Sequence, residues 1–141
     1  MKRIWLAGLI TVAIGAPAAA AVADGIAAPY LHIQLALAND STDGVPEAAR
    51  AIAAEAAKMG DSAKRVAAAA AAVAGASNIT VTRAAFGPLS DALIKYGEEV
   101  GFGDLRVAYC PMVRKSWVQE AGDIRNPFYG SEMLTCGNFA K

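Results

Sequence analysis

The middle of this 141-residue chain is dominated by alanine, and this composition constrains the fold more than any other feature. Alanine has the highest intrinsic helix propensity of all residues. Between positions 29 and 100, larger apolar residues recur three or four positions apart, which is the spacing of one helix face. Glycine, proline and short polar residues interrupt this pattern three times. We therefore predict four helices.

The breaks in the pattern place the ends of these helices. The first helix is expected from Pro29 to near Asn39, and the second from about 43–46 to Gly60. The third should run from 61–62 to 75, and the fourth from 78 to 101, with a bend or the true start at Pro88. Because the connections are short, the helices should form an up-and-down four-helix bundle. The predicted fold class is mainly all-α.

The carboxy-terminal part of the chain, from about 104 to 141, has a different pattern. Apolar residues at 105, 107 and 109 alternate with Arg106 and Ala108, which indicates a short strand. Residues 113–128 are expected to form a hairpin or an ordered loop. Residues 133–136 should form one helical turn, which Gly137 ends. We expect this region to be a small strand and loop cap on the bundle, within one domain spanning 24–141.

The first 23 residues have the three parts of a secretory signal peptide. A basic start, Met1-Lys2-Arg3, precedes an apolar run of about a dozen residues and then a run of small residues. Small residues at Ala21 and Ala23 suit a cut before Asp24, and a cut a few residues earlier suits the sequence nearly as well. The apolar run is too short to span a bilayer comfortably. We expect a periplasmic mature chain without membrane insertion.

Charge and residue type argue against several functions. The 13 basic and 13 acidic residues balance, and removal of Lys2 and Arg3 leaves a slightly acidic chain. Without a basic stripe, nucleic acid and anionic membrane surfaces are poor partners. His32 is the only histidine, and no serine or cysteine has an evident base beside it in the sequence. We expect no enzymatic activity.

Four sulfur-bearing residues gather in the cap: Cys110, Met112, Met133 and Cys136. In an extended chain Cys110 and Met112 would project to the same side, and Met133 and Cys136 would lie side by side on a helical turn. Thiolates and thioethers favour monovalent copper or silver over harder cations. The four residues are therefore candidate metal ligands.

A disulfide between Cys110 and Cys136 is the main alternative. Outside the cytoplasm two thiols are free to oxidise. Closing a loop of about 26 residues would stabilise a small exported domain by roughly 3–4 kcal/mol in the chain-entropy model. The sequence leaves open whether Trp117 shields a bound cation or is core, and whether His32 contributes a ligand.

Several segments carry a family resemblance. The order YCPM at 109–112, IRNPFYG at 124–130 and MLTCG at 133–137 resembles a small exported bacterial domain of unassigned function. Weaker similarity covers LAND at 37–40 and RAAFGPLS at 83–90. That domain occurs alone or appended to periplasmic adaptor subunits of copper and silver efflux pumps. The resemblance implies a helical bundle with a cysteine-bearing cap, the same four soft ligands, and an efflux or adaptor protein as partner.

Two functional hypotheses follow. The first is a periplasmic protein that binds copper(I) or silver(I) and sequesters it or hands it over in heavy-metal tolerance. The second is a non-catalytic envelope interaction module whose cap is stapled by a Cys110–Cys136 disulfide. Organic cofactors have no sequence support in either case.

Overall fold

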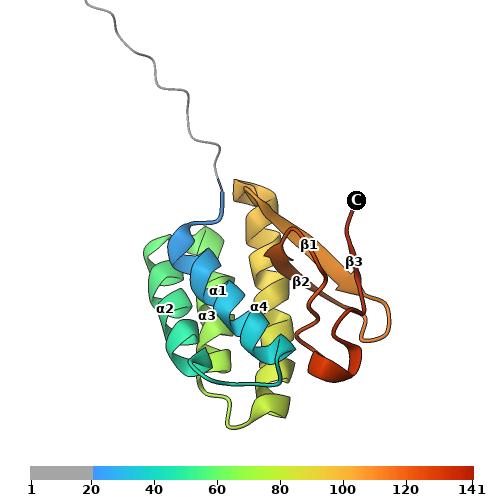
Figure 1. Ribbon diagram of the computed structural model, residues 1–141. Helices are drawn as coiled ribbons and strands as arrows, with labels where there is room; N and C mark the ends of the chain where they lie inside the picture. Colours follow the sequence, from blue (N-terminus) through green and yellow to red (C-terminus); the bar gives the residue numbers. More distant parts are fainter. Residues whose placement is uncertain (1–20) are drawn as a thin grey trace, which may run out of the picture.

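The computed structural model describes residues 21–141 of the chain, and four helices form its larger part (Figure 1). They are α1 (Asp24–Ala38), α2 (Val45–Lys58), α3 (Lys64–Ala74) and α4 (Ile79–Val100), with a short 3₁₀ helix, η1 (Asp61–Ala63), before α3. The four predicted helices are therefore present. Helix α1 begins earlier than expected, so that Pro29 lies inside it.

Helix α4 begins where the sequence predicted. The side chain of Asn78 accepts a hydrogen bond from the backbone N–H of Val81 at 3.0 Å, which satisfies one free donor of the first turn. Pro88 lies inside the helix rather than at its start. The buried face of α4 has the predicted helical spacing, with Phe86, Leu89 and Leu93 fully buried.

Three antiparallel strands follow the helices. They are β1 (Leu105–Cys110), β2 (Lys115–Glu120) and β3 (Asn138–Phe139), in the order β2-β1-β3. Strand β1 pairs with β2 from Leu105–Glu120 to Cys110–Lys115, and its other edge pairs with β3. The predicted strand is confirmed, and of the two alternatives for 113–128 the first part, 115–120, is the second strand of a hairpin and the rest is a loop. The inward face of β1 carries the small residues Ala108 and Cys110, while Tyr109 is exposed.

The prediction of a mainly all-α, up-and-down four-helix bundle with a small strand and loop cap is wrong, because the sheet is a layer of a mixed α and β fold. The helices contact one another in sequence order, α1 with α2, α2 with α3 and α3 with α4. Strand β2 packs against both α4 and α1 (Figure 1). The rings of Tyr30 on α1 and Phe86 on α4 stack at 5.0 Å, and Trp117 of β2 is fully buried. Bulky aromatic side chains thus join α1 and α4, the two helices next to the sheet, to that sheet.

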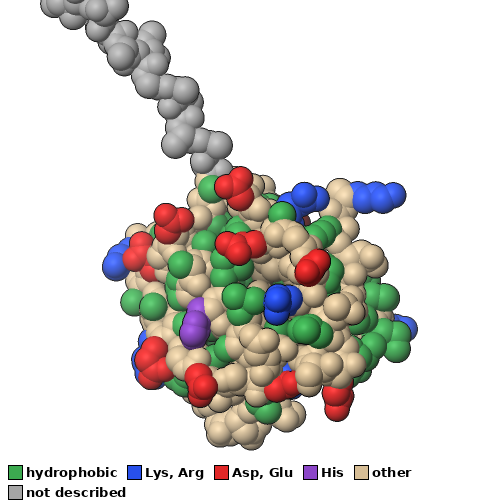
Figure 2. Space-filling view, in the orientation of Figure 1, with side chains coloured by type: hydrophobic (Ala, Val, Ile, Leu, Met, Phe, Trp, Pro, Cys, Tyr) green, Lys and Arg blue, Asp and Glu red, His purple; other side chains and the backbone are tan. Residues whose placement is uncertain are grey.

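The signal-peptide prediction concerns residues 1–23, of which 1–20 lie outside the described residues. Within the described part, no helix combines the length and the apolar character that crossing a bilayer requires. On the face seen in Figure 2, acidic and basic side chains are interspersed rather than gathered into a stripe.

Candidate functional site

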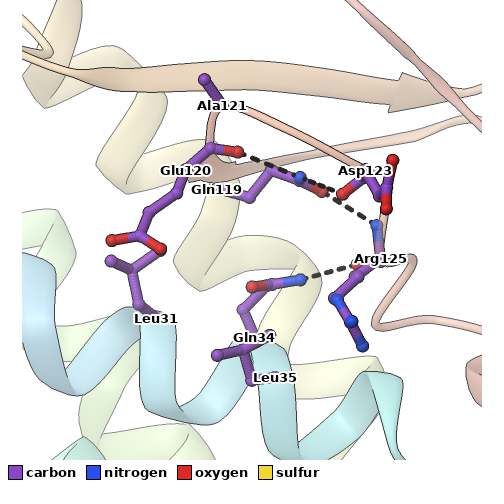
Figure 3. A pocket seen from close by; sticks show the side chains of 8 residues that line it. All are labelled: Leu31, Gln34, Leu35, Gln119, Glu120, Ala121, Asp123 and Arg125. Atoms are coloured by element: carbon purple, nitrogen blue, oxygen red, sulfur yellow. Dashed lines mark hydrogen bonds between the residues drawn. The ribbon is translucent and has the colours of Figure 1, made fainter.

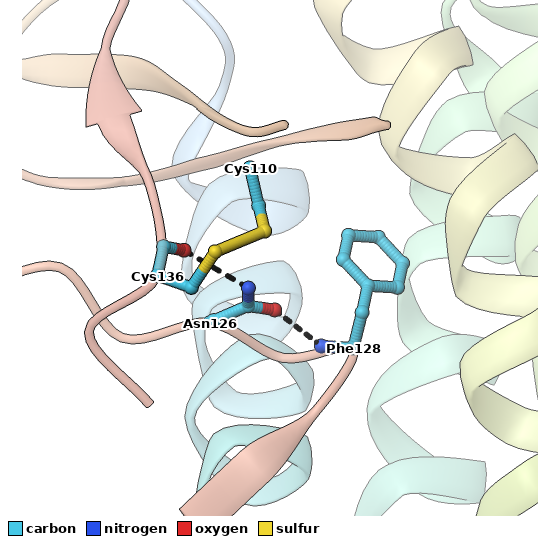
Figure 4. The surroundings of a disulfide bond; sticks show 4 residues. All are labelled: Cys110, Asn126, Phe128 and Cys136. Atoms are coloured by element: carbon cyan, nitrogen blue, oxygen red, sulfur yellow. Dashed lines mark hydrogen bonds between the residues drawn. A yellow bond between two sulfur atoms is a disulfide. The ribbon is translucent and has the colours of Figure 1, made fainter. Parts of the chain in front are cut away.

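The two cysteines form a disulfide that joins the end of β1 to the segment before β3 (Figure 4). Their Cα atoms lie 5.6 Å apart, which is within the usual range for this bond. Cys110 is fully buried on the inward face of β1, and Cys136 is partly buried. The bond therefore belongs to the core rather than to the surface.

Asn126, which is fully buried, holds the backbone on the Cys136 side of the bond. Its Nδ2 donates to the Cys136 carbonyl at 3.0 Å, and its Oδ1 accepts from the backbone N–H of Phe128 at 2.8 Å (Figure 4). Its own backbone N–H donates to the Leu134 carbonyl at 2.7 Å. Asn126 thereby fixes the position of Cys136 relative to the preceding loop.

Met112 lies apart from the buried cysteines. Strand β1 ends at Cys110, and the next four residues form the hairpin turn, in which the Arg114 N–H donates to the Cys110 carbonyl at 2.9 Å. The turn interrupts the extended geometry that would have kept Cys110 and Met112 on one side. Met112 is 67% exposed, whereas Cys110 is fully buried.

Met133 lies on the same turn of chain as Cys136. The Cys136 N–H donates to the Met133 carbonyl at 3.0 Å. The expected helical turn at 133–136 is displaced, because the 3₁₀ helix η2 spans Gly130–Met133 and a non-helical turn follows it. Since the two sulfur atoms of a disulfide carry no thiolate, this oxidised arrangement does not fit a soft metal ion.

Trp117 and His32 have structural partners. The Trp117 indole N–H donates to Gln119 Oε1 at 2.9 Å, and the ring meets Phe128 edge-on at 6.1 Å between centroids. A Cβ atom on Gly137 would lie 2.8 Å from the Trp117 ring, so this ring underlies the backbone next to Cys136. The His32 Nε2 lies 2.9 Å from the Asp43 carbonyl in the loop between α1 and α2.

A polar network that the sequence reasoning missed joins the helices to the cap. Arg83 on α4 donates to Asp40 Oδ1 at 2.7 Å, to the Leu37 carbonyl at 2.6 Å and to the Pro127 carbonyl at 2.9 Å. The other oxygen of Asp40 accepts from the backbone and hydroxyl of Ser131. The Ser131 hydroxyl first, and then Arg83, lower the pKa of Asp40 to about 2. Asp40, Arg83 and Pro127 are far apart in the sequence, so no local pattern could have related them.

Comparison of the chain with protein-family models, with curated proteins and with solved structures finds no match.

Proposed function

We propose that this chain is a non-catalytic interaction module of the cell envelope whose cap is stapled by the Cys110–Cys136 disulfide. The observation that carries the proposal is the full burial of Cys110 in its bond to Cys136. A buried disulfide resists reduction by solvent thiols, because the attacking thiolate must reach a sulfur atom. This suits a permanent staple in an oxidising compartment.

The segments that carry the family resemblance support the same proposal. Their polar residues contribute contacts between helices and cap: Arg83 donates to the Pro127 carbonyl, and Asp40 accepts from the Ser131 N–H. These contacts hold the helices and the cap in one arrangement, and so keep the surface that they share rigid. A rigid surface loses little conformational entropy on binding, which favours recognition of a partner.

The redox state of the cysteines is the first test. Protein taken directly from the periplasm is trapped in acid, denatured and treated with a maleimide mass tag, with and without prior reduction. We expect no tag without reduction and two tags after it. Two tags on the unreduced sample would contradict the staple.

Partner contact is the second test. A photo-crosslinking amino acid replaces Met112 or Leu35, two exposed apolar residues, and Ala54 on the exposed face of α2 is the matched control position. We expect a discrete envelope adduct from at least one of the two positions and none from Ala54. Absence of an adduct at both positions, or the same adducts at Ala54, would contradict an interaction module.

A second candidate function is binding of copper(I) or silver(I) by the reduced chain. The observation that favours it is that the disulfide brings Cys110 next to Cys136, whose N–H donates to the carbonyl of Met133. Reduction would give two thiolates next to this thioether, a donor set that suits monovalent copper. Native mass spectrometry of the reduced protein, titrated anaerobically with copper(I), should then show one bound ion. Uptake that persists unchanged in Cys110→Ser combined with Met133→Leu would contradict it, and Met59→Leu is the control.

A further inference from the structure

A small cavity of about 230 Å³ lies between α1 and the loop that follows β2 (Figure 3). Leu31 and Leu35 on α1 form its apolar wall. Its polar lining includes Gln34 from α1, Glu120 at the end of β2, and Asp123 and Arg125 from the loop. The cavity is separate from the disulfide. Its volume is smaller than that of typical drug-binding pockets, so it suits a single small group.

Gln34 is the most buried polar residue of this lining, at 1% exposed, and within the described part of the chain only its Nε2 is hydrogen-bonded. Its Nε2 donates to the Arg125 carbonyl at 2.6 Å. A carbonyl oxygen only accepts, so this bond fixes the orientation of the amide and turns Oε1 away from Arg125, towards the Glu120 side (Figure 3). No described residue donates to this Oε1.

The open oxygen must face the cavity. Among the described residues, no buried polar side-chain atom lacks a hydrogen-bond partner. Since Gln34 Oε1 lacks a partner, it retains contact with the cavity space. Gln34 therefore presents at the cavity wall an accessible acceptor that a bound donor can reach.

Hydrogen bonds of the Gln119 side chain hold the loop side of the cavity in place. Gln119, which is 4% exposed, accepts at Oε1 from the Trp117 indole and from the Arg125 backbone N–H at 3.1 Å. Its Nε2 donates to the carbonyls of Glu120 and Asp123, at 3.1 and 2.9 Å. The cavity is therefore preorganised, which reduces the entropic cost of binding.

The charges at the rim select the type of donor. Glu120, Asp123 and Arg125 are exposed, and none of them forms an ion pair within the described part of the chain. Two carboxylates and one guanidinium leave one net negative charge. Leu35 is 41% exposed beside them. This combination favours a singly charged cation with an apolar stem and discourages a second positive charge near Arg125.

We propose that this cavity binds a primary alkylammonium group, either the side chain of a lysine on a partner protein or a free monoamine. The alkyl stem lies along Leu31 and Leu35, and the ammonium donates to Gln34 Oε1 and to the Glu120 carboxylate. An ammonium has three donors and no acceptor, which matches these oxygens. The lysine source rests on the proposed interaction function; the amine site itself does not.

The test is a titration of the exported, oxidised protein followed by amide NMR. The probes are Nα-acetyl-lysine-N-methylamide and n-butylamine, and Nα-acetyl-norleucine-N-methylamide is the matched control because it keeps the stem without the ammonium. We expect saturable, millimolar binding of a charged probe that shifts the Gln34 side-chain amide and the Arg125 backbone amide. Tighter binding of the lysine probe indicates a protein partner, and equal binding of both indicates a free amine; either supports the site.

Two variants make the titration decisive. Glu120→Gln should weaken binding by about three- to fivefold, the effect expected for a partly exposed charge pair. Glu132→Gln, an exposed carboxylate outside the cavity, should leave it unchanged. Equal shifts with the norleucine probe, no saturable shifts with either amine, or equal affinity in Glu120→Gln would overturn the proposal. The mass-tag result, and the crosslinking result at Met112, which lies outside the cavity, are independent of all these outcomes.

Discussion

Arg83 of α4 and Asp40, just beyond the end of α1, form an ion pair with 2.7 Å between Nη2 and Oδ1. The same guanidinium binds the carbonyls of Leu37 and Pro127. Gly130 lies so close to both charged groups that a Cβ at this position would clash with them. One pair thus connects two helices to the loop that leads to the disulfide.

Acid should weaken the Asp40–Arg83 ion pair, because protonation removes the negative charge of Asp40. The folded pKa of Asp40 is about 2, below its ordinary value of 3.8. A lowered carboxyl pKa contributes stability that is complete above the unfolded pKa and is lost as pH falls through the folded value. We therefore expect the free energy of unfolding to fall between about pH 4 and pH 2, and this loss should be smaller in Asp40→Asn. Urea unfolding across this range checks it, with Asp104→Asn as control. The same pH profile in wild type and Asp40→Asn would contradict the assignment.

The Tyr30 hydroxyl should contribute measurably to stability. It is fully buried, lies 2.7 Å from Ser90 Oγ and accepts from the Val118 N–H at 3.1 Å. Burial is the main cause that raises the pKa of Tyr30, so the group stays neutral. Tyr30→Phe leaves both partners without this bond and should cost about 1–3 kcal/mol in urea unfolding. Tyr109→Phe, at a 43% exposed position, should change stability little. Equal effects of the two variants would refute this role.

Loss of the disulfide should be costlier than loss of any single hydrogen bond. The cysteines are 26 residues apart in sequence, for which the chain-entropy model gives about 3.5 kcal/mol. We expect Cys110→Ala with Cys136→Ala to lower the free energy of unfolding by about this amount. Reduction of the wild type should have a similar effect, and reductant should not affect the double variant. A loss below about 1 kcal/mol would show that the cap is held mainly by its other contacts.

Gly137 offers a way to separate backbone strain from contact with Trp117. Its φ is +146°, and an added Cβ would lie 2.8 Å from the Trp117 ring. Gly122 has a comparable φ of +128° with nothing within 4 Å of the added atom. Both alanine variants carry backbone strain of about 1 kcal/mol or more, and Gly137→Ala should lose further stability through the ring. Thermal unfolding followed by Trp117 fluorescence compares them. Equal losses of stability in the two variants would mean that the Trp117 ring shifts to accommodate the added Cβ with no measurable cost in stability.

The sequence allowed the helices to be predicted because their signals are local. Asn78 before α4 and the alanines of α3 determine structure within a turn or two of chain. The mixed architecture was missed because aromatic residues such as Tyr30 and Phe86 have the same spacing whether they face another helix or a sheet. The Cys110–Cys136 pair was recognised, but spacing alone does not decide between a disulfide and a metal site. The Asp40–Arg83 pair joins residues that no local pattern relates.

The contacts of Val22 bear on where the predicted signal peptide would be cut. Its side chain is 6% exposed, and its N–H donates to the Gly101 carbonyl at 3.0 Å, at the end of α4. A cut after Ala23 would remove both contacts, whereas a cut after Ala20 keeps them and also has small residues at the required positions. We therefore expect the intact mass of the exported protein to correspond to a chain that begins at Ala21.

The stability of a Val22→Ala variant provides an independent check on this cut. Removing two buried methyl groups should lower the free energy of unfolding of the exported protein by about 1–2 kcal/mol if Val22 is retained. The matched control is Val81→Ala, at a 44% exposed position on α4, which should have little effect. An exported chain that begins at Asp24, with unfolding unchanged by Val22→Ala, would place the cut after Ala23. The packing of Val22 against Gly101 would then be absent from the exported form.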